Sequence, residues 1–317
     1  WEDFVRQRIM EPLGMTGSNF ATDASRQTSD YAMPYKKIKG EVRLVDFYDK
    51  LAAIAPAGAI NSSVADMSKW VLLQLNKGKQ GETQLISEAR LGQIHTPYML
   101  VPDPRKYTEV HYASYGLGWS INSYRGHLVV QHGGGIDGFS ALTMLFPDDN
   151  IGMVVLTNRE GCPAHTVVAF NAFERLLGLS ETPWSERFKK EVDEQEEMLE
   201  KGKQESASKR VLDTHPSHEL SAYTGDFEHP GYGRLSVTLE DGHLQVIYNT
   251  MQCELEHYHY DIFDINYEEF EGVVLKAVFT IGVEGDVESL AIGLGLDPAL
   301  GPIVFKRVAQ AGDAEKA

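Results

Sequence analysis

The chain has 317 residues with 46 acidic and 29 basic side chains, which gives a formal net charge of −17 at pH 7. Most of this charge lies in residues 216–317, which hold 18 acidic and 5 basic side chains; nucleic acid and anionic membranes are therefore excluded as expected partners. No stretch approaches the ~18 consecutive apolar residues of a membrane helix, and Cys162 and Cys253 match no metal or redox spacing.

The pattern of apolar residues predicts three helices before residue 100. Helical spacing is found in residues 1–15, in a segment capped by Ser62 or Ser63, and in residues 87–95. Irregular structure is expected for residues 21–50 and 100–113. Pro56-Ala57-Gly58 predicts a turn.

A meander of strands is expected next. Apolar runs between turn residues predict strands at 115–121, 128–132, 140–146 and 151–158, with a glycine loop at 133–138. Turns are expected at 124–127 and 147–150. A helix over residues 163–177 follows, and Gly178 can close it.

The composition changes after residue 180. Residues 181–215 are rich in Glu and Lys, which predicts a helical connector that becomes a flexible linker near residues 204–209. Short strands with tight turns then predict a small antiparallel barrel or sandwich in residues 216–317. The predicted strands are 234–239, 243–248, 254–261, 273–280, 287–293 and 303–308. We therefore expect three parts, namely residues 1–180, 181–215 and 216–317.

The glycine run after residue 132 has one alternative interpretation. Gly133, Gly135 and Gly138 fit the dinucleotide motif G-x-G-x-x-G, and Glu160 lies about twenty residues further on, as a ribose-binding acid should. That motif must open a helix. Only residues 139–146 separate Gly138 from the turn at 147–150, and they are better explained as a strand. Dinucleotide binding is therefore the weaker hypothesis.

Seven short motifs occur in order along the first half of the chain. They are WEDF at 1–4, EPLGM at 11–15, PAG at 56–58, YGLGW at 115–119, HGGG at 132–135, GFS at 138–140 and VVLTN at 154–158. In this order and at these spacings they resemble the serine β-lactamase/penicillin-binding-protein-like hydrolases, in particular the class C β-lactamase-like branch with esterases and D-peptidases. The resemblance covers residues 1–178. Residues 216–312 are similar to the lipocalin-like C-terminal domain of some members.

The resemblance implies an α+β fold, in which part of an antiparallel sheet is flanked by helices and followed by an all-β lipocalin-like barrel. It implies a serine hydrolase that needs no cofactor and forms an acyl-enzyme with a small-molecule or peptide substrate: an ester, a β-lactam or a peptide with D-amino acids. Three motifs carry this chemistry in the family. They are Ser-x-x-Lys, Tyr-x-Asn and Lys-Thr-Gly, the last becoming His-x-Gly in this branch.

Only the third motif is recognised here, as His132-Gly133-Gly134. In the family the first two precede the segment that matches Trp1, so we expect this chain to lack the nucleophile and to be inactive alone. Its expected partner is the missing N-terminal segment, present as a separate chain or lost, without which the strand at 151–158 would expose an edge. A homo-oligomer is left open, as are periplasmic, extracellular and cytoplasmic locations.

The resemblance assigns the candidate site to the third motif. His132 is expected to donate to a substrate carboxylate or carbonyl, or to give electrostatic support for the missing tyrosine. Gly135 matches the position whose backbone N–H binds the oxyanion, and Gly133 and Gly134 permit close approach of the backbone to a substrate. The alternative for His132 is a strand-end histidine bonded to neighbouring backbone.

Three further residues are candidates for the substrate pocket. Gly58 borders the cleft or is a plain turn residue. Tyr115 and Tyr98 line the pocket or pack in the core. The alternative function is a non-catalytic module whose barrel carries a ligand.

Two literal motif matches are expected to have no catalytic role. Ser206-Ala207-Ser208-Lys209 fits Ser-x-x-Lys but follows the third motif and lies in the charged segment. Ser120-Ile121-Asn122 fits Ser-x-Asn but lies in a predicted strand. His257 and His259 could hold a metal from one face of a strand, but no third ligand is evident and a solvated stripe is the favoured interpretation.

Overall fold

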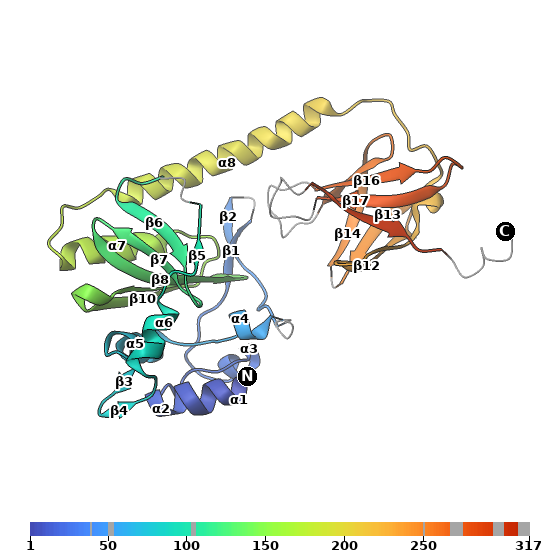
Figure 1. Cartoon of the computed structure of the whole chain (residues 1–317). Coiled ribbons are helices and arrows are strands. Elements are labelled where there is room, and N and C mark those ends of the chain that lie inside the picture. The colour runs from blue at the N-terminus through green and yellow to red at the C-terminus, as the bar shows by residue number, and fades with distance from the viewer. Residues whose placement is uncertain are drawn as a thin grey trace. The chain divides into compact units, whose positions relative to one another are not determined.

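The computed structural model describes residues 1–38, 40–49, 54–102, 106–249, 251–266, 275–293 and 301–309. The chain forms two compact units, residues 1–190 and residues 191–317 (Figure 1). The first unit contains a six-stranded sheet with helices, and the second contains a closed barrel.

The first unit begins with a helical segment, as predicted for residues 1–15. It consists of α1 (Glu2–Val5), a π-helical stretch η1 (Arg6–Met10) and α2 (Glu11–Leu13). Gly14 ends it in the left-handed conformation, with φ of 67°. A short helix α3 (Thr22–Arg26) follows.

The expectation of irregular structure for residues 21–50 is wrong in part. Strands β1 (Tyr35–Ile38) and β2 (Glu41–Leu44) form an antiparallel hairpin there. Every residue of β2 is exposed, and β1 is uniformly half-buried. The period-2 alternation that marks a half-buried strand is therefore missing, and the sequence pattern could not show it.

Serine caps begin the next two helices, and the cap expected at Ser62 or Ser63 is Ser63. Ser63 accepts a hydrogen bond from the backbone N–H of Asp66 at the start of α5 (Val64–Leu75). Ser87 caps α6 (Glu88–Ile94) in the same way. The remaining elements of this region are the helical turn α4 (Ala55–Gly58) and the small hairpin of β3 (Lys79–Gln80) and β4 (Thr83–Gln84).

The central sheet has the order β10-β9-β8-β7-β6-β5, and all neighbours are antiparallel. Its strands are β5 (Met99–Leu100), β6 (Val110–Tyr115), β7 (Ser120–Tyr124), β8 (His127–Ile136), β9 (Phe139–Phe146) and β10 (Ile151–Thr157). A 3-10 turn η2 (Pro147–Asp149) joins the last two. The turns predicted at 124–127 and 147–150 are thus confirmed.

Three predictions about this sheet are wrong in whole or in part. The predicted strand 115–121 is interrupted, because β6 ends at Tyr115 and β7 begins at Ser120. A Cβ on Gly116 would lie 2.6 Å from the carbonyl oxygen of Ile94, so the chain turns tightly against the end of α6. The predicted loop at 133–138 is mostly strand, since β8 continues to Ile136. Strands β5 and β6 also occupy part of the predicted loop 100–113, of which residues 103–105 lie outside the described residues.

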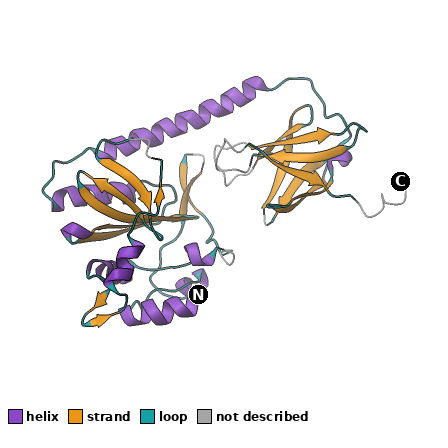
Figure 2. Ribbon diagram, viewed as in Figure 1, coloured by secondary structure: helices purple, strands orange, loops and turns teal. Residues whose placement is uncertain are grey.

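Helices cover both faces of the sheet (Figure 2). On one face α5 packs through Val71 against Val130 and Leu145. On the other, α7 (Ala164–Leu176) contributes Phe170 and Phe173 to a second buried cluster. The sheet is therefore the middle of three layers, as expected for an α+β fold.

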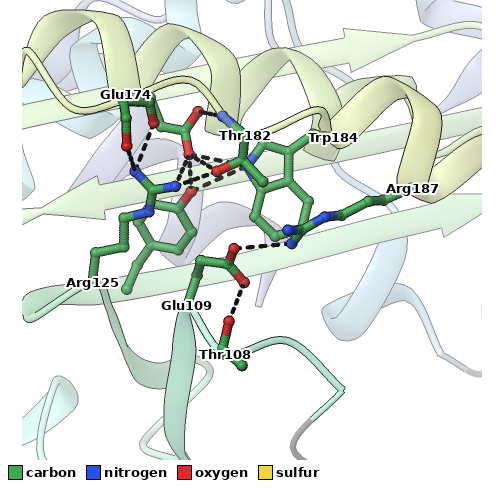
Figure 3. A network of polar contacts seen from close by, with 9 residues as sticks. Thr108, Glu109, Arg125, Glu174, Thr182, Trp184 and Arg187 are labelled. Carbon is green, nitrogen blue, oxygen red and sulfur yellow. Dashed lines mark hydrogen bonds and ion pairs between the residues drawn. The ribbon is translucent and has the colours of Figure 1, made fainter.

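A buried carboxylate fixes the start of α8 (Trp184–Lys209) to this core (Figure 3). Glu174 is fully buried and accepts hydrogen bonds from Tyr124 at 2.5 Å, from the N–H of Thr182 at 2.7 Å and from the indole of Trp184 at 3.3 Å. The guanidinium of Arg125 lies 3.3 Å from the same carboxylate. Burial alone would raise the pKa of Glu174, but these hydrogen bonds outweigh it and hold the pKa below its ordinary value.

Helix α8 extends further than expected. Residues 204–209 are its last residues rather than a flexible linker. The segment has few apolar residues, so its helical state follows from strong helix formers such as Glu, Lys and Gln rather than from a buried stripe.

The second unit contains an eight-stranded closed antiparallel barrel, which confirms the predicted barrel. A 3-10 turn η3 (Leu220–Tyr223) precedes it. Its strands are β11 (Gly225–His229), β12 (Gly233–Glu240), β13 (His243–Tyr248), β14 (Met251–His259), β15 (Ile262–Asn266), β16 (Leu275–Ile281), β17 (Val287–Ile292) and β18 (Ile303–Arg307). Strands β11 and β15 were not predicted, and residues 273–274 of the predicted strand 273–280 lie outside the described residues.

Aromatic and aliphatic side chains fill the barrel. Phe227, Phe263, Phe279 and Phe305 are buried in one cluster with inward aliphatic residues of strands β12 to β18. A barrel of this size is just wide enough for side chains to fill it. Its interior is therefore a packed core.

Candidate active site

The candidate site lies where strand β8 extends beyond its neighbour β7. Pairing with β7 ends at Gln131, which lies opposite Ser120, the first residue of that strand. Pairing with β9 continues on the other side to Ile136. Among the described residues, no strand pairs with Gly133 or Gly135 on the β7 side, so β8 has an open edge there.

The turn between β7 and β8 determines which backbone groups point to that open edge. Its central residues, Arg125 and Gly126, both have positive φ, of 48° and 89°, which is the signature of a type I′ hairpin turn. The closing pair of such a turn is hydrogen-bonded, and hydrogen-bonded pairs then alternate along the ladder. Gln131 therefore bonds toward β7, and the N–H and C=O of Gly133 and Gly135 point in the same direction.

Because every second residue of β8 bonds in the same direction, the expected oxyanion donor lies at the open edge. The N–H of Gly135 is directed away from β9 and meets no strand of the described residues on that side. A Cβ on Gly135 would meet no heavy atom of the described residues within 4 Å, so the face of the sheet toward which it would point is open at this glycine. The position is suited to a donor, and its catalytic use stays a prediction.

The imidazole of His132 is held at the same edge by two hydrogen bonds. Its Nδ1 bonds the carbonyl oxygen of Gly133, and its Nε2 lies 3.0 Å from the hydroxyl of Tyr115. The two rings meet edge-on with centroids 6.1 Å apart. His132 and Gly133 to Gly135 are exposed, so a ligand can reach them.

The tip of the β8–β9 hairpin is clamped by an earlier segment. Tyr35 donates its N–H to the carbonyl of Gly138 at 3.2 Å, and Gly138 donates its own N–H to the Glu160 carboxylate at 3.3 Å. Lys36 lies 3.4 Å from that carboxylate. A Cβ on Gly138, which has φ of 83°, would lie 2.2 Å from Cβ of Pro34. The clamp fixes the strand that carries Gly135.

These contacts contradict the dinucleotide interpretation of Gly133, Gly135 and Gly138. Strand β9 follows Gly138 directly, so no helix N-terminus is available for a pyrophosphate. Glu160 bonds Gly138 and Lys36 instead of presenting a free carboxylate for a ribose.

Of the three candidates for the substrate pocket, the structure connects one to His132 by a hydrogen bond. Tyr115 contacts His132, but Gly58 ends the helical turn α4 and, within the described part of the chain, no hydrogen bond links it to His132. Tyr98 is 60% exposed, which contradicts its interpretation as a core residue. Its N–H donates to the carbonyl of Tyr115 at 3.0 Å.

The two motif matches that are expected to be decoys lie at the end of a helix and within a strand. Ser206 and Lys209 lie in the last turn of α8, where the helix dipole disfavours a developing alkoxide. The carbonyl of Ser206 accepts a hydrogen bond from Tyr258. Ser120 and Asn122 lie within β7.

His257 and His259 bond neighbouring groups, and a β-bulge lies between them. Nε2 of His257 bonds the carbonyl of Tyr260 at 3.0 Å, and Nδ1 of His259 accepts the N–H of Val211 at 3.1 Å. Among the residues that the structure describes, no three His, Cys, Asp or Glu side chains gather as a metal site. No helix formed by the described residues has the length and apolar character needed to cross a membrane.

Comparison with known proteins gives two family matches. The profile of the family described as Beta-lactamase matches residues 1–176, and that of a domain of unknown function, DUF3471, matches residues 209–307. An unguisins hydrolase of Aspergillus violaceofuscus is 29% identical over 279 residues, which cover 78% of this chain and 48% of that protein. A second unguisins hydrolase, from Aspergillus campestris, is 24% identical over 94% of this chain and 57% of its own length. The chain thus spans about half the length of these relatives.

A solved structure shares the fold. The octameric penicillin-binding protein homologue from Pyrococcus abyssi superposes with a TM-score of 0.51 at 21% sequence identity, covering 96% of this chain and 60% of the other. At this identity the likeness concerns the fold alone.

Proposed function

The chain belongs to the beta-lactamase family, and from this premise we propose that it is the part of a serine acyl hydrolase that provides one side of the reaction site. The observation that carries the proposal is the open edge of β8. There the Gly135 N–H is directed away from β9, two residues beyond Gly133, whose carbonyl bonds His132. A backbone donor beside a titratable side chain is what acyl transfer needs.

The proposed reaction proceeds through an acyl-enzyme. A serine oxygen attacks the substrate carbonyl, and the negative charge that develops on the carbonyl oxygen is stabilised by the Gly135 N–H together with the N–H of the nucleophile itself. One such donor contributes about 10²–10³ in kcat. Water then hydrolyses the acyl-enzyme. The substrate class is an ester, a β-lactam or a peptide with D-amino acids.

The nucleophile is proposed to lie outside these 317 residues, in the remainder of the whole protein. Ser-x-x-Lys occurs in this sequence at Ser206 and Lys209 alone, and Tyr-x-Asn does not occur. The position of Ser206 in the last turn of α8 is unfavourable for a nucleophile. We propose that the chain by itself is inactive and that the remainder of the protein completes the site against the open edge of β8.

The alternative of a ligand-carrying barrel has less support. Side chains of every strand fill the barrel interior, and Phe227, Phe279 and Phe305 are at most 4% exposed. The barrel therefore contributes a packed domain, and we assign the chemistry to the first unit.

The proposal is tested by hydrolysis assays on the whole protein. A chromogenic cephalosporin, a p-nitrophenyl ester and a D-amino-acid p-nitroanilide represent the three substrate classes. We expect turnover of at least one of them, and a loss of about 10²–10⁴ in kcat/KM in His132→Asn. His127→Asn is the matched control, because His127 lies at the other end of β8, where it bonds Asp149 at 2.8 Å. Equal activity of both variants would contradict the assignment of the site.

Self-association is a second property of the whole protein to measure. The homologue from Pyrococcus abyssi is octameric, and we propose that the whole protein also forms a homo-oligomer. Sedimentation of the purified protein would show a single species with the mass of one copy if this is wrong.

A further inference from the structure

Among the residues that the structure describes, Tyr115 is the one side chain outside β8 that contacts His132. Its hydroxyl lies 3.0 Å from Nε2, and it comes from the end of β6, two strands away in the sheet. Resting on the proposed function, we propose that Tyr115 is a positioning residue that holds the His132 imidazole in one tautomer and one orientation at the open edge of β8.

The hydrogen-bond partners determine where the protons are. The carbonyl oxygen of Gly133 can only accept, so the Nδ1 of His132 that bonds it carries a proton. In the neutral imidazole Nε2 is then unprotonated and accepts, so the Tyr115 hydroxyl donates to it. The Gly133 carbonyl is free to accept the Nδ1 proton because the alternating hydrogen-bond pattern of β8 directs this carbonyl away from β9.

Tyr115 is itself rigidly placed by its backbone. Its carbonyl accepts the N–H of Tyr98 at 3.0 Å, and the following residue, Gly116, donates its N–H to the carbonyl of Trp119 at 2.8 Å. Gly116 has no room for a Cβ, which would lie 2.6 Å from the carbonyl oxygen of Ile94. The tight turn of the YGLGW motif thus fixes the Tyr115 hydroxyl relative to His132, and a site of this kind needs such support.

This arrangement changes the role expected for His132. In the neutral pair the Nδ1 proton is used in the bond to the Gly133 carbonyl and the Tyr115 hydroxyl proton in the bond to Nε2, so His132 has no N–H left to donate to a substrate. Its one basic atom is Nε2, and a proton taken up by His132 binds there, at the atom that Tyr115 already contacts. His132 is therefore prepared as a proton acceptor rather than as a donor.

The test is nitrogen-15 NMR of the histidine rings in the 317-residue chain, with His132 identified by its absence in His132→Gln. We expect a protonated Nδ1 and an unprotonated, hydrogen-bonded Nε2 in the neutral wild-type ring. Tyr115→Phe should shift the Nε2 signal toward that of a nitrogen without a donor. The matched control is Tyr112→Phe, because Tyr112 lies on the same strand and is 83% exposed.

Two results would overturn the proposal: a neutral wild-type ring protonated at Nε2, or an Nε2 signal that Tyr115→Phe leaves unchanged. The wild-type spectrum alone decides the tautomer, so the proposal stays testable if the variant fails to fold. In the whole protein we expect Tyr115→Phe to lower kcat about tenfold at unchanged KM, as the loss of one hydrogen bond predicts. Absence of all hydrolysis would contradict the proposed function but leave the ring spectra as the test of the tautomer.

Discussion

Replacing Gly138 by alanine tests how tightly the hairpin tip beside the open edge is clamped. Gly138 has φ of 83°, and an added Cβ would lie 2.2 Å from Cβ and 2.6 Å from Cα of Pro34. A left-handed backbone costs a residue with a Cβ about 1–2 kcal/mol, and overpacking costs about 1–3 kcal/mol more. The expected loss in the free energy of unfolding is therefore about 2–5 kcal/mol.

Gly126→Ala is the matched control for this substitution. Gly126 has a similar φ of 89°, but a Cβ there would have no heavy atom within 4 Å. Its expected cost is the conformational one alone, about 1–2 kcal/mol. The difference between the two variants isolates the contact with Pro34.

Urea denaturation followed by tryptophan fluorescence measures both variants. The four tryptophans, at positions 1, 70, 119 and 184, all lie in the first unit, so the signal reports on that unit. Hydrogen exchange at the amides of Tyr35 and Glu160 should accelerate in Gly138→Ala and not in Gly126→Ala, because the Tyr35 N–H bonds the Gly138 carbonyl and the Glu160 N–H bonds the Tyr35 carbonyl. Equal losses of stability in the two variants would refute the reasoning.

Three further predictions concern the first unit and use the same denaturation assay. Glu174→Gln should lower the free energy of unfolding by about 3–5 kcal/mol, because it leaves Arg125 facing a neutral group in a buried network. The control Glu181→Gln breaks an exposed pair and should lower it by less than about 1 kcal/mol. Because folding lowers the pKa of Glu174, its ionised form stabilises the fold above the ordinary glutamate value of about 4.3, and this contribution is lost as the pH falls through the lower folded pKa. The difference in unfolding free energy between wild type and Glu174→Gln should thus be constant above the ordinary glutamate pKa of about 4.3 and shrink as the pH falls below it. A difference independent of pH down to about 2 would contradict the assignment. Ser63→Ala should cost about 1 kcal/mol through loss of the cap of α5, and no change would show that the cap is not used.

Local signals in the sequence predicted much of the fold. The caps at Ser63 and Ser87 and the turn at residues 124–127 were predictable, because each depends on residue types within one turn of chain. The barrel was predictable from its short strands and tight turns. The caps and the turn lie in residues 1–176, which match the first family, and the short strands lie in residues 209–307, which match the second.

Features that depend on distant residues were not predictable. The turn at Gly116 is caused by the carbonyl of Ile94, and the strand predicted across it ignored that neighbour. Glu174 lies in an ordinary helical pattern, and its partners Tyr124 and Thr182 come from other elements. A charged residue at a helix position that faces the core was the one available signal for this network.

The candidate site was predictable in its residues but not in its geometry. The glycines suggested a loop after His132, whereas they continue strand β8 as an unpaired edge. Glycine lacks a side chain to pack, so propensity argues against strand at positions where pairing with β9 determines the structure. Tyr115 was expected to line the pocket or to pack in the core. Its bond to His132 depends on the position of β6 two strands away from β8 in the sheet, which the sequence did not predict.

The most direct test of the account is to locate the serine that reacts with an acylating probe. The whole protein is treated with a fluorophosphonate, digested and analysed by mass spectrometry. We predict that the modified serine belongs to a Ser-x-x-Lys sequence outside the 317 residues described, and that this chain alone remains unmodified. Modification of Ser206, or of any other serine within these residues, would contradict the proposal that β8 provides one side of a site whose nucleophile lies elsewhere in the protein.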